Sequence, residues 1–465
     1  MSRRSARPST GTIAAARRCA YAVLRRVFEH GAYAERALQS QSRGLDGRDR
    51  ALAMRLAYGS VQRRGTLDYL IEQLAERPVG RLDPPVLAAL RLGLYELLYL
   101  GGSPDYAVVA DAVELVKEDA HAGHGLVNAV LRRAGREGVS ALLAPLGDAT
   151  PAQAAVKHSH PEWIARLWWQ SLGPDDARAL MACDNEPSEL ALRANTLLTD
   201  AHALARELPV RTRTDPDIPE ALVLEEPFDV QGSALWRTGA FLAQSRAAML
   251  VARALDPRPD QRVLDLCAAP GGKSTHVAAL MQGRGEVLAV ERNRARAGAL
   301  VHRARRLRAP NVRVEVADAA LARPEGAVFD RVLVDPPCSG LGTLAARADL
   351  RWRVTPQQVR EMAAAQAAIL SAGAGALRPG GLLVYSTCTI SPLENERLIA
   401  AFLDSHPGFA PDDLAAEYPA LRLRRAGESR RGAEPAPVGC GPGLVLTLPH
   451  RDRTAGFFIA RLRRS

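Results

Sequence analysis

The sequence is poor in cysteine and has no long apolar run. Only six of its 465 residues are cysteine, they are scattered, and no pair of them has the spacing of zinc ligands. This excludes a disulfide framework and leads us to expect no metal. No stretch of about 18 apolar residues without charge occurs, so we expect no membrane span. The Arg-rich start is not followed by a sustained apolar segment, which argues against a signal peptide.

These absences favour the cytoplasm, where thiols stay reduced and available for chemistry. The chain also has a basic charge balance, with 61 Lys and Arg, 51 Asp and Glu, and a net charge of +10. A basic balance fits a polyanionic partner, most simply nucleic acid. A solvated surface without a partner fits it equally well, so charge alone does not decide.

Four stretches of different texture follow one another along the chain. Residues 1–10 are basic and contain Ser and Pro, which predicts a disordered tail. Helical patterns broken by Gly, Pro and Asp predict an all-α domain over residues 11–140. Its expected helices include Ala14–Glu29, Asp46–Arg64, Gly65–Glu76, Pro84–Leu100, Ala107–Ala120 and Gly125–Arg136. Short strand-like and helical pieces predict a connecting α+β module over residues 141–254. Over residues 255–465 buried strands alternate with Ala-rich helices, which predicts an α/β domain with a doubly wound parallel sheet.

The first predicted strand of this α/β domain runs into a turn of small residues, Asp265–Lys273. Small residues after a first strand let a ligand approach the backbone closely. The spacing Gly-x4-Gly-Lys-Ser/Thr of a phosphate loop is absent, and so is the dinucleotide pattern Gly-x-Gly-x-x-Gly. The turn therefore predicts a ligand loop of another kind.

Acidic residues end the next three predicted strands. Glu291 follows the second strand and can accept hydrogen bonds from both hydroxyls of a ribose. Asp318 follows the third strand, expected over Val312–Val316, and suits an adenine amino group, and Asp335 follows the fourth. Any one of them could be a helix N-cap, but the three together predict a nucleoside site.

Two cysteines close strand-like runs in the same domain. Cys338 follows Val332–Asp335, and Cys388 follows Leu382–Tyr385. Ligands of open α/β sheets bind just beyond the carboxyl ends of the strands, so we expect both thiols to face one crevice with Asp335. The alternatives are that both are inert core residues, as a single buried cysteine usually is, or that they form a redox disulfide.

Three of these runs together resemble the motifs of a known family. Asp265–Lys273, Asp335–Gly340 and Ser386–Thr389 resemble those of the RNA 5-methylcytosine methyltransferases, in particular the RsmB/Sun/Fmu type that acts on 16S ribosomal RNA. The likeness covers most of the chain, because Pro104–Val109 and Gly125–Arg132 resemble the NusB-like RNA-binding domain of that type. The resemblance implies a Rossmann-like methyltransferase domain with RNA as its partner, and we expect a monomer.

The resemblance implies S-adenosylmethionine as the methyl donor. Residues at ten positions match the donor site of the family: Cys267, Ala268, Ala269, Pro270, Gly271, Gly272, Lys273, Glu291, Asp318 and Asp335. Within this set we expect Cys267 to pack against its neighbours rather than to react.

The resemblance also implies unequal roles for the two cysteines. Cys388 matches the nucleophile of the family, whose thiolate attacks carbon 6 of cytosine so that carbon 5 can take the methyl group. Cys338 matches the cysteine that promotes product release, and Asp335 would contact ring nitrogen 3. A free cysteine forms its thiolate only near pH ~8.5, so we expect a positive field beside Cys388, from Lys273 or from a helix terminus.

Three further runs depart from the family pattern or extend it. Ala345–Asp349 keeps the acid of the family's run but loses its proline, and Gln244–Ala248 replaces a Gln-Asp-x-x-Ser run. Both departures put substrate positioning in question. Glu394–Glu396 matches a run that follows the nucleophile, and we expect it to cap or brace the next helix.

Arg-rich stretches are candidate contacts for RNA phosphates. They are Arg303–Arg308, Arg347–Arg353 and Arg422–Arg431. For each of them a solvated charged surface is the alternative. We expect the helical domain and the connecting module to provide much of the RNA selection.

Other functions stay open on the sequence. The same chemistry could act on transfer RNA, although the helical block favours ribosomal RNA. An RNA-binding or antitermination factor with a vestigial enzyme domain is a second alternative, against which the intact donor loop and both cysteines argue. A DNA cytosine methyltransferase would use the thiol of Cys338 as its nucleophile and would not need Cys388.

Overall fold

A computed structural model describes most of the chain. The described ranges are residues 13–119, 121–321, 329–414 and 443–465. Within these ranges no helix is long and apolar enough to cross a membrane. The same ranges hold no group of His, Cys, Asp or Glu side chains that could bind a metal ion.

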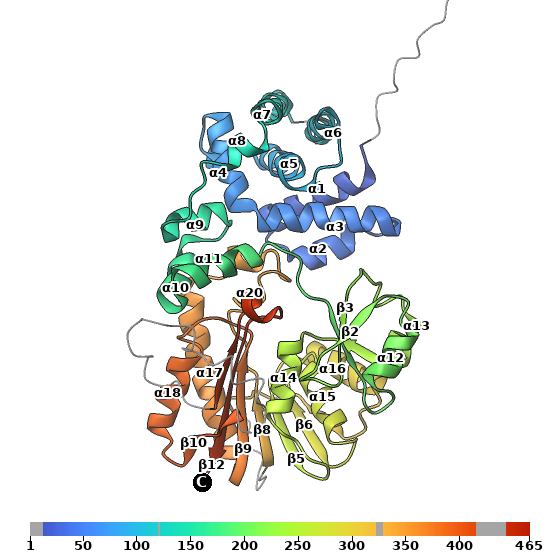
Figure 1. Ribbon diagram of the computed structural model, residues 1–465, viewed down its shortest axis with the longest axis vertical. Coiled ribbons are helices and arrows are strands. Elements are labelled where there is room, and N and C mark those ends of the chain that lie inside the picture. The colour runs from blue at the N-terminus through green and yellow to red at the C-terminus, as the bar shows by residue number, and fades with distance from the viewer. Residues whose placement is uncertain (1–12, 120, 322–328, 415–442) are drawn as a thin grey trace, which may run out of the picture. The chain divides into compact units, whose positions relative to one another are not determined.

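The chain divides into two compact units (Figure 1). Unit 1 comprises Met1–Glu186 and Leu344–Arg353, and unit 2 comprises Pro187–Thr343 and Val354–Ser465. The segment Leu344–Arg353 thus packs with unit 1, although unit 2 surrounds it in sequence. The division at residue 186 falls inside the stretch for which the sequence predicts a connecting module.

Unit 1 is helical, and its described residues contain no strand. Its helices begin at residues that favour a helix start: the Asp46 carboxylate accepts the Asp49 amide before α3, and Pro84 opens α5. The helices are α1 (Ala15–His30), α2 (Ala34–Gln41), α3 (Gly47–Gln62), α4 (Arg64–Ala75), α5 (Pro84–Tyr95), α6 (Asp105–Glu118), α7 (His124–Glu137), α8 (Val139–Leu143), α9 (Pro151–Lys157), α10 (Glu162–Leu172) and α11 (Pro174–Cys183).

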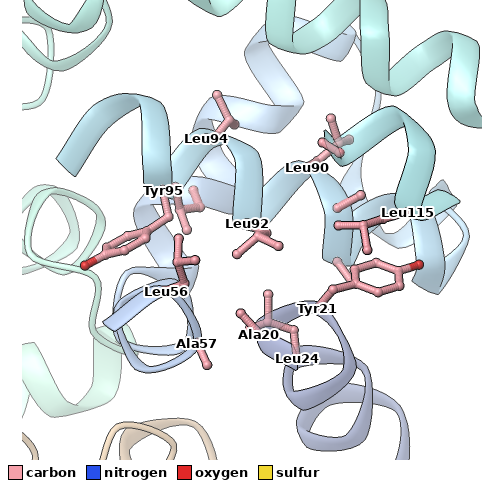
Figure 2. Close-up of a cluster of buried hydrophobic side chains, with 14 of the residues drawn as sticks. Ala20, Tyr21, Leu24, Leu56, Ala57, Leu90, Leu92, Leu94, Tyr95 and Leu115 are labelled. Atoms are coloured by element: carbon pink, nitrogen blue, oxygen red, sulfur yellow. The ribbon is translucent and has the colours of Figure 1, made fainter. Parts of the chain in front are cut away.

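The core of unit 1 is a cluster of aliphatic side chains from several helices (Figure 2). Leu24 of α1, Leu56 of α3 and Leu90 of α5 are fully buried in it. Full burial of one such side chain stabilises a fold by about 1.5–3 kcal/mol. The apolar residues that recur at helical spacing in the sequence are therefore the ones that face this core.

The helices predicted for this region form, and most end within two residues of the expected positions. The exception is the helix expected over Pro84–Leu100, which is α-helical only to Tyr95 and continues as a π-helical turn over Glu96–Leu100. Apolar periodicity does not distinguish the two helix types. The short helix α2 was not among the expected elements.

Unit 2 begins with a small antiparallel sheet. Its strand order is β2-β3-β1-β4, and Phe241 and Leu222 are buried on its core side. The strands are β1 (Ala191–Ala194), β2 (Thr212–Thr214), β3 (Ala221–Leu224) and β4 (Phe241–Ala243), and the helices of this part are α12 (Ala201–Glu207) and α13 (Ala234–Thr238).

The rest of unit 2 is a large mixed sheet with the order β10-β12-β9-β8-β5-β6-β7, with β11 paired to β12. The strands from β9 to β7 are parallel, and β12 runs antiparallel to β9. The strands are β5 (Arg262–Leu266), β6 (Glu286–Val290), β7 (Val312–Glu315), β8 (Phe329–Val334), β9 (Leu377–Thr387), β10 (Phe409–Pro411), β11 (Leu444–Thr447) and β12 (Phe457–Arg464).

Helices cover both faces of this sheet. On one face Gly373 of α17 lies against Val332 and Val334 of β8, so closely that a Cβ atom there would stand 2.8 Å from Val334. On the other face Leu333 and Val384 belong to a core that includes α14 and α15. The helices are α14 (Arg246–Ala254), α15 (Gly272–Leu280), α16 (Arg294–Arg306), α17 (Pro356–Ala376), α18 (Glu396–Ser405) and α20 (Pro449–Asp452). The predicted doubly wound α/β class is confirmed.

The strand order fixes where a ligand can bind. From β5 the chain proceeds outward through β6 and β7, and then returns to the other side of β5 to form β8 and β9. The topological switch point therefore lies between β5 and β8. Ligands of doubly wound sheets bind outside the carboxyl ends of the strands at that point. The predicted donor loop and both cysteine turns follow these carboxyl ends.

Candidate active site

The structure brings the two strand-end cysteines into contact. Cys338 follows β8 and Cys388 follows β9, and these strands are parallel neighbours with Val334 opposite Tyr385. The two Sγ atoms lie 3.4 Å apart and form no disulfide. A disulfide would need about 2.05 Å, so the pair is two thiols within hydrogen-bond reach. The expected proximity of the two thiols is the arrangement observed.

The environment of Cys338 favours its protonated form. The hydrogen bond with Cys388, burial, and the negative charges of Cys388, Glu394 and Asp335 all raise the pKa of Cys338 well above its usual value. Two sulfur atoms this close cannot both be thiolates, because their negative charges would repel each other strongly. At least one of the two thiols therefore keeps its proton, and burial with the nearby acids favours Cys338 for that role.

Lys273 and Asp335 form an ion pair beside the thiols. Lys273 Nζ lies 2.7 Å from Asp335 Oδ2, and Ser386 Oγ donates to Asp335 Oδ1 at 2.9 Å. Burial lowers the pKa of Lys273, but Asp335 and the negative charge of Cys388 outweigh it, so the pKa is raised. Lys273 therefore stays positively charged near Cys388. It is one of the two sources of positive field expected beside this thiol, the other being a helix terminus.

The predicted donor loop leads from β5 into α15. Cys267 is partly buried there, and burial, followed by nearby acids, raises its pKa to about 12. The thiol stays protonated, in keeping with a packing role. Gly271 has φ +95°, and a Cβ atom at this position would stand 2.9 Å from Leu300, so glycine suits both the turn and the packing. Arg296 donates to the Ala269 carbonyl at 2.7 Å and holds the loop from α16.

Beneath the donor loop lies a buried carboxyl group. Asp265 is fully buried, Ser274 Oγ donates to its Oδ2 at 2.6 Å, and its Oδ1 has no hydrogen-bond partner in the described structure. Burial is the main reason why the pKa of Asp265 rises to about 7. A buried oxygen without a partner costs about 1–3 kcal/mol, which a ligand that donates a hydrogen bond would recover. The loop therefore fits a bound group with donors.

The other expected acids of the donor site also stand at strand ends. Glu291 follows β6 and is buried, and its Oε1 accepts the Asn293 amide at 2.8 Å. Its Oε2 has Arg296 at 3.7 Å, which leaves acceptor capacity for a ligand. Asp318 is exposed and accepts the Ala320 amide at 2.9 Å. The strand expected to reach Val316 ends one residue earlier, so Asp318 lies in the following turn.

The run Glu394–Glu396 does not cap the next helix as expected. Helix α18 begins at Glu396, and its N-cap residue Asn395 makes no side-chain cap hydrogen bond. Asn395 instead accepts the Thr387 hydroxyl at 2.6 Å and donates to the Thr389 carbonyl at 3.0 Å. Capping by Asn395 is therefore wrong, because its side chain bonds to β9 and to the Cys388 turn instead. The alternative expectation, that the run braces the helix, stays a prediction.

Several arginines proposed as phosphate contacts bind the protein itself. Arg351 is fully buried in unit 1, where it donates to the carbonyls of Ser159 and Asp184 at 3.0 and 2.9 Å. For Arg351 the phosphate prediction is wrong, because a buried guanidinium bonded to carbonyls cannot reach a solvated strand. Arg353 also donates to a carbonyl of unit 1, that of Gly31, at 2.9 Å.

The stretch Arg303–Arg308 is similarly divided. Arg306 donates to the Trp236 carbonyl at 2.6 Å and its guanidinium lies 4.4 Å from the ring centre of Trp236. Arg305 and Arg308 are exposed, as is Arg347, and these three remain candidates for phosphate. The stretch Arg422–Arg431 lies outside the described residues.

The two runs that depart from the family pattern make structural contacts. In unit 1 Ala348 is buried in the helical core, and the Ala345 carbonyl accepts Gln62 Nε2 at 2.9 Å. In unit 2 the Ser245 hydroxyl accepts the Ala248 amide at 3.3 Å and so caps α14. The altered residues therefore complete the packing of their own unit.

Three family models match consecutive stretches of the chain. Residues 14–136 match the NusB family. Residues 160–231 match the ferredoxin-like domain of RsmF/B-like methyltransferases. Residues 252–463 match the model described as 16S rRNA methyltransferase RsmB/F.

Individual proteins give the same result over nearly the whole chain. A protein of Synechocystis sp. named probable ribosomal RNA small subunit methyltransferase B is 34% identical over 97% of this chain and 99% of its own length. A Bacillus subtilis protein of the same name is 34% identical over 94% of this chain and 96% of its own length. The solved structure of NSun6 from Pyrococcus horikoshii with SFG covers 65% of this chain and 98% of its own, with a TM-score of 0.56. At 23% identity this last likeness shows a shared fold.

Proposed function

Because this chain belongs to the family of 16S rRNA methyltransferases RsmB/F, we propose that it methylates carbon 5 of a cytosine in 16S ribosomal RNA. Membership of the family makes it an RNA methyltransferase that uses S-adenosylmethionine, and it confirms the resemblance found in the sequence. The observation that supports the cytosine-5 reaction is the thiol pair, Cys338 and Cys388, with 3.4 Å between their sulfur atoms.

Cys388 is the covalent nucleophile in this proposal. Carbon 5 of cytosine is a poor nucleophile until a bond forms at carbon 6. Attack of the Cys388 thiolate on carbon 6 makes that bond and moves an electron pair toward carbon 5, which then bonds the methyl group. When bound, S-adenosylmethionine supplies this methyl group. Water then takes the proton from carbon 5, the electron pair of that bond restores the double bond between carbons 5 and 6, and the bond between sulfur and carbon 6 breaks so that its electrons leave with the sulfur.

Cys338 has the properties that the release step needs. Its pKa is raised well above the usual value, first by the hydrogen bond with Cys388, so it holds a proton beside the sulfur that must leave. Passing this proton to Cys388 as its bond to carbon 6 breaks would stabilise the departing sulfur. A thiol at this distance can do so without a rearrangement of the backbone.

Asp335 and Lys273 are assigned to the charge that develops on the base. Addition of a thiolate at carbon 6 places negative charge on ring nitrogen 3. We place Asp335 against this nitrogen, to which it would have to bring a proton, with Lys273 Nζ 2.7 Å from its Oδ2 as the positive charge that balances the carboxylate left behind. The same cation favours the thiolate form of the nearby nucleophile.

The donor site in this proposal is the set predicted from the sequence. The loop Cys267–Lys273 would follow the donor, with Glu291 on the ribose hydroxyls and Asp318 on the adenine amino group. The unpaired Oδ1 of Asp265 and the available Oε2 of Glu291 support this placement. The NSun6 structure, which shares the fold, holds SFG, an analogue of S-adenosylmethionine.

We further assign RNA binding mainly to the NusB-like stretch and to the connecting module, and catalysis to residues 255–465. We place the reaction in the cytoplasm and treat the enzyme as a monomer. Size-exclusion chromatography with light scattering tests the last assignment, and a mass near twice 50.0 kDa would contradict it.

Methyl transfer from labelled S-adenosylmethionine to purified 16S RNA, followed by bisulfite mapping, tests the proposal. We expect 5-methylcytosine at a defined position in 16S RNA and none in transfer RNA incubated in parallel. Label in transfer RNA alone would favour the transfer RNA alternative. Label in neither RNA would favour a binding factor whose enzyme domain is inactive.

A further inference from the structure

A buried carboxylate lies in the loop that leads from the Cys388 turn to α18. Glu394 has no exposed surface. Its Oε1 accepts the Ser339 amide at 2.8 Å and Gln366 Nε2 at 3.0 Å, and its Oε2 accepts the Ser339 hydroxyl at 2.5 Å. All of these contacts bring donors to the carboxylate, so the group is suited to carry its negative charge within the fold.

The hydrogen bonds of Glu394 reach the neighbours of both thiols. Ser339 directly follows Cys338, and its hydroxyl lies 2.6 Å from the hydroxyl of Thr389, which directly follows Cys388. Because the Ser339 hydroxyl gives its only proton to Glu394, the Thr389 hydroxyl must donate to Ser339. One directed chain therefore runs from the turn after β9, through the turn after β8, to the carboxylate.

Other buried groups hold Glu394 in place. The Tyr385 hydroxyl donates to the Glu394 carbonyl at 2.6 Å and lies 3.1 Å from Gln366 Oε1. Gln366 Nε2 also donates to the Pro337 carbonyl at 2.9 Å, one residue before Cys338. Tyr385 of β9 thus holds the main chain of Glu394, and Gln366 of α17 holds its carboxylate. The carboxylate in turn holds the two cysteine turns.

We propose that Glu394 is a positioning residue that holds the Cys338 and Cys388 sulfurs in register for the covalent reaction and for product release. The proposal rests on the proposed cytosine-5 reaction and adds to it a group that touches neither the base nor the donor. Glu394 acts through Ser339 and Thr389, which define the ends of both cysteine turns. Its charge also lies among the causes that keep the pKa of Cys338 raised, after the hydrogen bond to Cys388 and burial.

The variant Glu394→Gln tests this role with little change in shape. An amide in place of the carboxylate must turn its NH2 group either toward the N–H donors at Oε1, which it repels, or toward the Ser339 hydroxyl, which must then accept, so the directed chain from Thr389 to residue 394 is lost. We expect turnover to fall about 100-fold, the size of effect that a misplacement of about 1 Å produces. We expect a covalent RNA adduct to accumulate because release is impaired, while KM for S-adenosylmethionine stays unchanged. Loss of turnover without adduct, or turnover like the wild type, would overturn the proposal.

The variant Glu396→Gln is the matched control. It makes the same change two residues away, in the first turn of α18, where no side-chain hydrogen bond to the cysteine turns is present in the described structure. It should retain turnover within about twofold. The double variant Cys338→Ala with Glu394→Gln should lose clearly less than the product of the two single losses, because residues that act as one unit are not additive. A loss equal to that product would contradict action on the same thiol pair.

A readout without RNA separates this proposal from the proposed function. Diamide oxidises the two thiols to a disulfide, taking up their two hydrogens, and mass spectrometry of the intact holoprotein follows the loss of two mass units. The wild type and Glu396→Gln should close the Cys338–Cys388 bond at one rate, and Glu394→Gln at least about tenfold more slowly. Equal rates would contradict the positioning role, even if methylation of 16S RNA were shown. Failure to methylate any RNA would leave this comparison intact.

Discussion

The donor loop and the thiol pair each have a buried acidic residue next to them, Asp265 and Glu394. The two carboxyl groups differ in how many of their oxygen atoms accept hydrogen bonds. Under the donor loop, Asp265 has an Oδ1 with no hydrogen-bond partner in the described structure, and burial is the main cause that raises its pKa to about 7. Under the thiols, Glu394 accepts hydrogen bonds on both oxygens. Both residues are fully buried, so exposure does not explain the difference.

The difference fits the roles of the two halves of the proposed site. The thiol half is complete within the protein, as a preorganised reacting group requires, since any rearrangement would add to the barrier. The donor half retains unused acceptors on Asp265 and Glu291, as a binding site for an exchangeable molecule requires. Substitutions in the thiol half should therefore change the rate of chemistry, and substitutions in the donor half should change affinity or stability.

The largest expected effect is in the thiol half. Cys388→Ala removes the nucleophile, so methyl transfer should fall by at least about 1,000-fold, because the covalent route is closed. Transfer of labelled methyl groups to 16S RNA measures it. The control is Cys183→Ala, which removes a partly exposed thiol of unit 1 and should leave the rate unchanged. Equal rates for the two variants would break the comparison.

The second effect separates the two thiols. Cys338→Ala keeps the nucleophile but removes the proton beside it, so turnover should fall about 100-fold, within the range for loss of one acid–base group. The first methyl transfer should still occur at close to the wild-type rate. A single-turnover experiment with excess enzyme resolves this burst from the slow release. A slow burst would place Cys338 before methyl transfer instead.

The third effect tests the donor half. Glu291→Ala removes the acceptor proposed for the ribose hydroxyls, and hydrogen bonds to a charged group contribute about 1.5–3 kcal/mol. The dissociation constant for S-adenosylmethionine should rise between about 10- and 100-fold, while kcat at saturating donor stays near the wild-type value. Calorimetry and steady-state kinetics measure the two quantities. A fall in kcat with unchanged affinity would remove the distinction between the halves.

The last effect is on stability rather than on the reaction and depends on pH. The pKa of Asp265 rises from 3.8 to about 7 on burial, so the folded chain binds more protons than the unfolded chain between these values. Stability from this group is present below that window and is lost as pH rises through it. Relative to Asp265→Asn, the wild type should lose up to about 1.4 kcal/mol of unfolding free energy per pH unit.

Chemical denaturation without donor at a series of pH values measures this difference. Asp318→Asn, which changes an exposed carboxyl in the same way, is measured in parallel as the control. A flat difference between Asp265→Asn and the wild type would mean that Asp265 is ionised throughout. The lack of a hydrogen-bond partner on Asp265 Oδ1 would then no longer support a donor-binding site at this loop.

The sequence was informative where function depends on strand ends. Cys338, Cys388 and Asp335 follow buried strands, and parallel neighbouring strands bring such residues together whatever the helices do. The register of β8 against β9, with Val334 opposite Tyr385, then accounts for the contact of the two sulfurs. This part of the site could be predicted because it requires only strand identity and order.

The sequence was less informative where function depends on side chains far apart in the chain. Glu394 was expected to serve the adjacent helix, and its contacts to Ser339 lie 55 residues away. Arg351 was read as a surface charge, and it binds a carbonyl 192 residues away. Local sequence patterns carry no information on such contacts, because the residues next to a glutamate or an arginine do not show whether the fold will bury its side chain. A buried partner was the missing signal in both cases.

The measurement that tests the central claim most directly is the identity of the cysteine that bonds RNA. Cys338→Ala incubated with 16S RNA and S-adenosylmethionine should accumulate a covalent adduct that survives denaturation. After nuclease and protease digestion, mass spectrometry should find a methylated cytidine on the peptide that contains Cys388. An adduct on Cys338 in the Cys388→Ala variant, with none on Cys388, would contradict the assignment of the two thiols.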